Sequence, residues 1–245
     1  KHLGTYGDIG CYSLSTPKII SSGQGGYLVT DNDALATKIN QIKNFGRKES
    51  GKDIFEIFGI NLKYTDIQAV ITIEQMKKLD YRVKRMGEIY NMYYKELSEH
   101  VRMIEPLFNG WHPWFIDIYC PSNNFRTELM AYLKQHKIQT RETYVEINKT
   151  EMYYTDTTLP ISNYVSQNGL YLPSYVDLTD EQILHICNLI KLFALFKKNV
   201  IEYRSLKVTD KNAYLSLMNG YRPVQTEMND EEFNKTYNKI FNNGT

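Results

Sequence analysis

The sequence is poor in the residues and runs that mark several classes of protein. Its 245 residues contain three cysteines, which stand far apart at Cys11, Cys120 and Cys187. None has the CxxC or Cys/His spacing of a metal site, so we expect no metal and free, mostly buried thiols in a reducing compartment. No apolar run approaches the roughly 18–20 residues of a membrane span. The formal net charge of +1 gives no general attraction to nucleic acid or membranes. We therefore expect a cytoplasmic protein that binds neither.

The chain also lacks an initiating methionine. It begins Lys1-His2-Leu3-Gly4, which reads as the middle of a loop or strand, and it stops just after a helical pattern. We expect no signal peptide, and we expect the chain to be a fragment of a longer protein. Its 42% hydrophobic and 23% charged residues are typical of a globular protein with one large domain or two smaller ones.

Hydrophobic periodicity predicts an α/β architecture in which short strands alternate with helices. The predicted strands are 9–16, 27–30, 114–119, one starting at 138, and 201–206. Residues 19–26 are predicted to form a short strand and a glycine-rich turn. The predicted helices are 31–44, one starting near 65, 81–100, 126–136 and 179–196. Two helix starts are specific, because Thr65 with Gln68 and Thr179 with Gln182 have the spacing of a capping box.

The residues with chemical potential are concentrated in positions 7–26. A strand of small and hydroxyl residues is followed there by Pro17-Lys18 and a glycine-rich turn. A lysine beside hydroxyls and glycines can hold a phosphate, and a desolvated lysine becomes a nucleophile toward carbonyls because its pKa falls. Ser13 and Ser15 can both bond a phosphate. On composition alone, an exposed turn lysine is the alternative.

This segment resembles the cofactor-lysine region of the DegT/DnrJ/EryC1/StrS nucleotide-sugar aminotransferases. Their pattern is G-D-x-G-x-[FY]-S-F-x-x-x-K followed by T-T-G-[EQ]-G-G. The matching residues are Gly7, Asp8, Gly10, Tyr12, Ser13, Lys18, Gly23, Gln24, Gly25 and Gly26. The resemblance implies the aspartate-aminotransferase-type α/β fold (fold type I) of enzymes that use pyridoxal 5'-phosphate (PLP). It also implies that Lys18 is catalytic and forms a Schiff base with PLP, and that Ser13 binds the PLP phosphate.

Two later stretches extend the resemblance to about residue 196. Asn61 lies in a match to G-x-N-x-[RK]-x-[TS]-D-x-Q-A, which implies that it reaches the cofactor phosphate of the other subunit in a homodimer with a shared active site. Arg141 and Tyr144 lie in a match to T-R-x-x-[YF], which implies that they bind the substrate. Asn148 stands where many members have a histidine that faces the substrate, so this departure concerns the sugar contacts.

The resemblance also implies an organisation and an activity. Residues 1–80 would form the C-terminal part of the large PLP-binding domain, 81–110 a connecting helix and 111–198 the small C-terminal α+β domain. Within the family the chain is most similar to the GDP-perosamine synthases of polysaccharide biosynthesis. This implies amination at C4 of a 4-keto-6-deoxy nucleotide sugar, with glutamate as amino donor. A 3-dehydratase is disfavoured, because it carries histidine where Lys18 stands. A non-catalytic nucleotide-sugar-binding or regulatory member of the same fold remains the alternative.

The family's aspartate that pairs with the pyridine nitrogen belongs to a segment that would precede Lys1. The cofactor ring withdraws electrons from the substrate only while that aspartate keeps the ring nitrogen protonated. We therefore expect this chain alone to be inactive. Residues 201–245 resemble the start of a GNAT N-acetyltransferase, with a strand at 201–206, a cap at Thr209-Asp210 and a helix near Phe233. Such a domain would acetylate the sugar amine. The alternative is a C-terminal helical extension or dimerisation arm.

Overall fold

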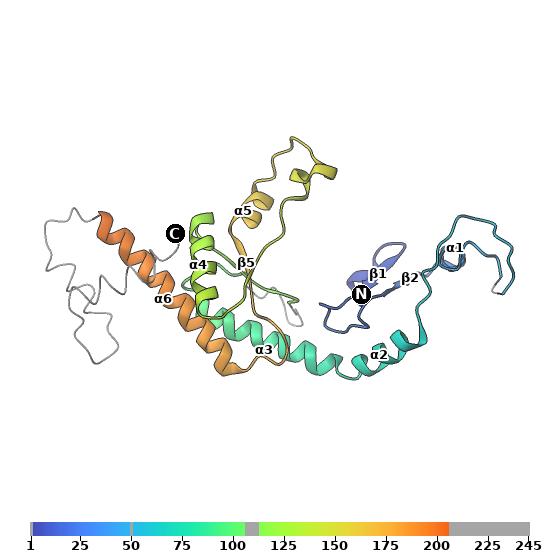
Figure 1. Cartoon of the computed structure of the whole chain (residues 1–245), viewed down its shortest axis with the longest axis horizontal. Coiled ribbons are helices and arrows are strands. Elements are labelled where there is room, and N and C mark those ends of the chain that lie inside the picture. The colour runs from blue at the N-terminus through green and yellow to red at the C-terminus, as the bar shows by residue number, and fades with distance from the viewer. Residues whose placement is uncertain (1, 50, 106–112, 206–245) are drawn as a thin grey trace. The chain divides into compact units, whose positions relative to one another are not determined.

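The computed structural model describes residues 2–49, 51–105 and 113–205, and the chain divides into two compact units (Figure 1). The first unit comprises residues 1–87, and the second begins at Glu88. The boundary falls inside the segment 81–110 that the sequence predicts as a connecting helix, and the helix α3 there spans Leu79–Leu97.

The first unit combines a two-stranded hairpin with two short helices. Its elements are η1 (Leu3–Thr5), β1 (Gly10–Ser13), β2 (Gly26–Val29), α1 (Asp33–Lys43) and α2 (Asp66–Met76). β1 and β2 are antiparallel, with Gly10 opposite Val29 and Ser13 opposite Gly26. The short strand predicted before the glycine-rich turn of residues 19–26 does not form, since residues 19–25 contain no strand and β2 begins at Gly26.

Capping side chains fix where both helices of this unit begin. The Asn32 side chain accepts hydrogen bonds from the backbone N–H groups of Ala34 and Leu35, which α1 itself leaves unpaired. At α2 the Thr65 hydroxyl accepts from the Gln68 backbone, and the Gln68 side chain accepts from the Thr65 backbone. The capping box predicted at α2 is therefore confirmed.

Within the first unit, α2 keeps its apolar face in solvent. None of its residues is buried, although its sequence is rich in aliphatic residues. Its large hydrophobic side chains are between 42% and 76% exposed: Ile67, Val70, Ile71, Ile73 and Met76. Leu14, directly after the hairpin strand β1, and Met86 are buried hydrophobic residues of this unit, each 3% exposed.

The second unit is an α+β layer. Its elements after α3 are β3 (Ile116–Tyr119), α4 (Asn123–Gln135), β4 (Arg141–Glu142), η2 (Ile147–Lys149), η3 (Glu151–Tyr153), α5 (Pro160–Asn168), β5 (Gly169–Leu172) and α6 (Asp180–Ser205). The three strands form an antiparallel sheet in the order β3-β5-β4. α4 and α6 contact one another (Figure 1).

The core of this unit is built from alternating strand residues and from one face of each long helix. Ile116 and Ile118 of β3 are fully buried, whereas Asp117 and Tyr119, which alternate with them, are half-buried, as the alternation of a strand requires. Helix residues with no exposed surface complete the core: Ile89, Tyr93, Leu97, Leu129, Leu133, Ile183 and Ile190. Burial of each aliphatic side chain contributes about 1.5–3 kcal/mol.

Three predicted boundaries in the second unit are wrong. α4 begins at Asn123 rather than 126, because Ser122 caps it by accepting from the Phe125 backbone. The strand expected from Ile138 is only Arg141–Glu142, since the Ile138 N–H bonds back to the Leu133 carbonyl at the end of α4.

The third error concerns the end of α6. The capping box at Thr179 and Gln182 starts this helix as predicted, but the helix continues through Ser205 instead of ending near Phe196. Residues 201–205 are therefore helical and not a strand. The remainder of the segment interpreted as an acetyltransferase start, residues 206–245, lies outside the described residues. Among the described residues, no helix is both long enough and apolar enough to cross a membrane.

Candidate functional site

Lys18 lies in the tight turn that follows the hairpin strand β1. Its backbone N–H bonds to the Ser15 carbonyl at 3.0 Å, which turns the chain immediately after the strand, and the residue is partly buried. The sequence thus places a primary amine at the end of a strand, next to three hydroxyl residues, Ser13, Ser15 and Thr16.

The hydroxyl groups of this turn lie close together. The Oγ atoms of Ser13 and Ser15 are 3.0 Å apart, and the Ser15 backbone N–H donates to Ser13 Oγ at 3.3 Å. Thr16 Oγ1 donates to the Gly23 carbonyl at 2.8 Å, which ties the lysine turn to the glycine loop. Two clustered hydroxyls and a backbone N–H are donors of the kind that bind phosphate oxygens.

The glycine loop needs glycine because other residues approach it closely. Gly25 has a φ of +134°, and a Cβ atom there would stand 2.5 Å from the Tyr64 ring. The Gly25 carbonyl accepts from the Leu14 N–H at 2.9 Å. The glycine at position 25 of the predicted motif therefore has a physical basis, because the loop packs closely against both Leu14 and Tyr64.

Asn61 belongs to the first unit, on the segment that leads to α2. Its backbone forms a bridge with Asn44 at the end of α1, and its Oδ1 accepts from the Lys63 N–H at 3.4 Å. The side chain is exposed. The structure thus brings Ser13 and Lys18 into one turn and places Asn61 on another, exposed segment of the same unit.

Arg141 and Tyr144 both belong to the second unit. Arg141 is the first residue of β4 and pairs with Tyr171 of β5. Its guanidinium carbon lies 5.0 Å from the centre of the Tyr144 ring, which in turn meets the Tyr171 ring edge-on at 6.2 Å. The two residues that the T-R-x-x-[YF] match singles out are therefore neighbours in space.

Arg141 also lines a groove at the end of the sheet where β5 ends. The groove has a volume of about 710 Å³, within the usual range of ligand pockets. Nearly buried aliphatic residues line it: Ile138, Leu172, Leu178 and Ile186. Its charged residues are Lys137, Arg141 and Glu181, and it also contains His136 and His185. Two permanent cations against one carboxylate make the groove suitable for an anionic ligand.

Asn148 is buried, with 6% of its surface exposed. Its Nδ2 donates to the Thr157 carbonyl at 2.9 Å, and the Thr155 N–H donates to its backbone carbonyl at 3.0 Å. The residue thus fastens η2 to the loop before α5. Across the described ranges, no group of three or more His, Cys, Asp or Glu side chains is arranged to hold a metal ion.

The structure agrees with the expectation of free, mostly buried thiols. All three cysteines are free; Cys120 and Cys187 are buried as expected, but Cys11 is exposed on β1. Burial raises the pKa of both Cys120 and Cys187 to about 12, so these two thiols stay protonated at neutral pH.

Comparison with known proteins defines the class of this fold and site. The model of the DegT/DnrJ/EryC1/StrS aminotransferase family matches residues 1–191, and the chain belongs to this family. It is 29% identical over 198 residues to the GDP-perosamine synthase of Vibrio cholerae, a match that covers 78% of this chain and 54% of that protein.

Solved structures agree on the fold, which is that of the PLP-dependent type I aminotransferases. The aminotransferase TlmJ from Streptoalloteichus hindustanus superposes with a TM-score of 0.74 at 23% identity, covering 81% of this chain and 55% of that one. NtdA from Bacillus subtilis, with bound cofactor PMP, gives a TM-score of 0.72 at 25% identity, covering 80% and 48%. The chain spans about half the length of the relatives it matches.

Proposed function

We propose that this chain carries the cofactor lysine of a PLP-dependent sugar-nucleotide aminotransferase, and that Lys18 is that residue. The observation that carries the proposal is the turn after β1, where one partly buried lysine directly follows a hydroxyl cluster. Thr16 ties this turn to a glycine loop in which Gly25 and Gly26 leave no room for a side chain. Because the chain belongs to an aminotransferase family, we interpret this lysine as the one that bonds to PLP.

The residues of the first unit fit PLP, because they supply both an amine and phosphate donors. Bound PLP would serve as an electron sink for the α-carbon of the amino donor. Lys18 Nζ would bond covalently to the cofactor and, once released, would move a proton between carbon atoms. Ser13 Oγ would donate to the phosphate, and Asn61 would do so from the partner subunit of a homodimer.

The substrate would be a 4-keto-6-deoxy nucleotide sugar, aminated at C4 with glutamate as donor. Support comes from the relatives named GDP-perosamine synthase in Vibrio cholerae and Escherichia coli O157:H7. A nucleotide sugar carries a diphosphate, and the groove beside Arg141 offers two permanent cations to such an anion. Arg141 and Tyr144 would hold this substrate. An acetyltransferase continuation in residues 206–245 stays a prediction.

An absorbance experiment tests the cofactor assignment. The chain is mixed with PLP, and the visible band of lysine-bound PLP is compared in the unaltered chain, in Lys18→Ala and in Lys38→Ala, an exposed lysine of α1. We expect the band to disappear in Lys18→Ala alone. Persistence of the band in Lys18→Ala contradicts the assignment, and nucleotide-sugar binding without any band favours the non-catalytic alternative.

A further inference from the structure

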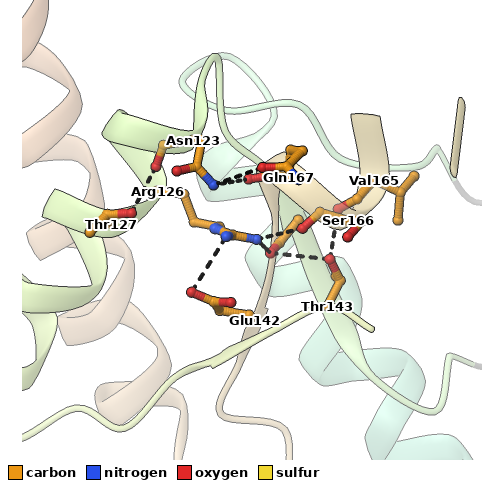
Figure 2. Close-up of polar contacts among 9 residues, drawn as sticks. Asn123, Arg126, Thr127, Glu142, Thr143, Val165, Ser166 and Gln167 are labelled. Atoms are coloured by element: carbon orange, nitrogen blue, oxygen red, sulfur yellow. Dashed lines mark hydrogen bonds and ion pairs between the residues drawn. The ribbon is translucent and has the colours of Figure 1, made fainter. Parts of the chain in front are cut away.

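Arg126 is buried, although it lies on a helix whose sequence is largely polar. Only 5% of its surface is exposed. Figure 2 shows its guanidinium between three elements: Nη1 donates to the Ser166 carbonyl at 2.6 Å and to the Gly169 carbonyl at 3.4 Å, and Nη2 lies 3.4 Å from Glu142 Oε1. The carbonyls at the end of α5 lack partners within the helix and attract a cation. One side chain of α4 thus fastens both α5 and β4.

Thr143, the residue after β4, also attaches this strand to the end of α5. Its Oγ1 donates to the Val165 carbonyl at 2.6 Å and approaches the Gly169 carbonyl at 3.3 Å, and its backbone N–H donates to Gly169 at 3.2 Å (Figure 2). A Cβ atom at position 169 would stand 2.4 Å from Thr143 Cγ2. The contact is therefore close-packed, and it depends on both the hydroxyl of Thr143 and the missing side chain of Gly169.

These two attachments hold the centre of a four-residue stretch and leave its ends in solvent. Thr143 is buried and Glu142, although exposed, pairs with Arg126, whereas Arg141 before them and Tyr144 after them are exposed. Arg141 and Tyr144 meet in a cation–π contact. Because a two-residue strand has few ladder hydrogen bonds of its own, its direction depends on these side-chain attachments.

We propose that Arg126 and Thr143 are positioning residues, which fix Arg141 and Tyr144 in the direction needed to bind the nucleotide sugar. The inference rests on the proposed role of Arg141 and Tyr144. Arg126 and Thr143 act through β4 and do not touch the substrate themselves. These two attachments pre-order the exposed pair Arg141 and Tyr144, which lowers the entropy lost when a ligand binds.

The test measures the affinity of the full chain for GDP-mannose, a stable GDP-linked hexose, by calorimetry. Thr143→Val removes the hydroxyl donor and keeps the branched shape, while Thr143→Ser keeps the donor. Thr127→Val is the matched control, because the exposed Thr127 hydroxyl donates to the Asn123 carbonyl within α4 (Figure 2). Arg141→Ala reports the substrate site itself. Circular dichroism checks that each variant is folded, and PLP bonding to Lys18 reports the first unit.

The expected Kd for GDP-mannose rises about threefold to tenfold in Thr143→Val, as loss of one buried hydrogen bond implies. The Kd returns to within about twofold of the original in Thr143→Ser and does not change in Thr127→Val, while PLP bonding stays the same in all three. A folded Thr143→Val with unchanged Kd, beside a weakened Arg141→Ala, overturns the positioning role and leaves the proposed function standing. No binding by the unaltered chain, or no effect of Arg141→Ala, overturns the substrate assignment and the positioning role together.

Discussion

The side-chain amide of Gln68 donates a hydrogen bond of 2.8 Å to the backbone carbonyl of Gln24, 44 residues earlier in the chain. The same side chain caps α2 through its oxygen. Gln68 thus joins two of the stretches that resemble family motifs, the glycine loop after Lys18 and the start of α2. The glycine loop is therefore held in part by Gln68, a residue outside the loop.

This double role predicts a separable effect of mutation. Gln68→Glu keeps an oxygen for the cap but puts a carboxylate against the Gln24 carbonyl, whereas Thr65→Ala removes the cap and keeps the link to the loop. We expect each change to lower the free energy of unfolding by about 1 kcal/mol. Hydrogen exchange in residues 14–25 should rise in Gln68→Glu only. Equal exchange in both variants would show that Gln68 does not order the loop.

The three cysteines should react differently with an alkylating reagent. Cys11 is exposed, while burial holds the pKa of Cys120 and Cys187 at about 12, and the thiolate is the reactive form. We expect iodoacetamide at neutral pH to label Cys11 alone in the folded chain, and all three in denaturant. Peptide mass spectrometry gives the sites. Labelling of Cys120 without denaturant would contradict the described core of the second unit.

An ion pair between α3 and α6 should make the second unit sensitive to acid. A hydrogen bond and the charge of Lys191 lower the pKa of Glu96 below its ordinary value of 4.5. Because the unfolded chain takes up this proton at higher pH than the folded chain does, the contribution to stability is complete above about pH 4.5 and is lost as the pH falls through the lowered pKa.

Glu96→Gln should therefore flatten the fall in Tm below pH 4.5. Thermal melts between pH 3 and pH 7 (roughly the range in which carboxyl groups titrate) check this, with Glu151→Gln, an exposed residue of η3, as the control. Identical pH profiles of Glu96→Gln and the unaltered chain would show that the ion pair does not stabilise the fold.

Local signals in the sequence predicted the starts of α2 and α6 and the lysine turn well. The capping boxes at Thr65 and Thr179 depend on residues three positions apart, so a single sequence contains the whole signal. The end of α6 was predicted too early, although no glycine or proline interrupts Asp180–Ser205. The start of α5 also had a signal, because proline is common in the first turn of a helix and α5 begins at Pro160. Hydrophobic periodicity alone does not contain this signal.

Long-range contacts explain what the sequence did not predict. A single sequence does not show what pairs with a buried Arg126, because its partners are carbonyls 40 and 43 residues away. The shortness of β4 likewise depends on where the chain leaves α4. Tertiary packing decides such features, so the residues that orient Arg141 and Tyr144 became visible only in the structure.

The central claim is that Lys18 bonds covalently to PLP. Its most direct test is borohydride reduction of the chain mixed with PLP, followed by proteolysis and mass spectrometry of every lysine peptide. The account predicts a stable pyridoxyl group on Lys18 at a PLP concentration that leaves Lys38 and the other lysines unmodified, and no site-specific labelling in Lys18→Ala. Equal labelling of Lys18 and exposed lysines, or selective labelling at another lysine, would contradict it.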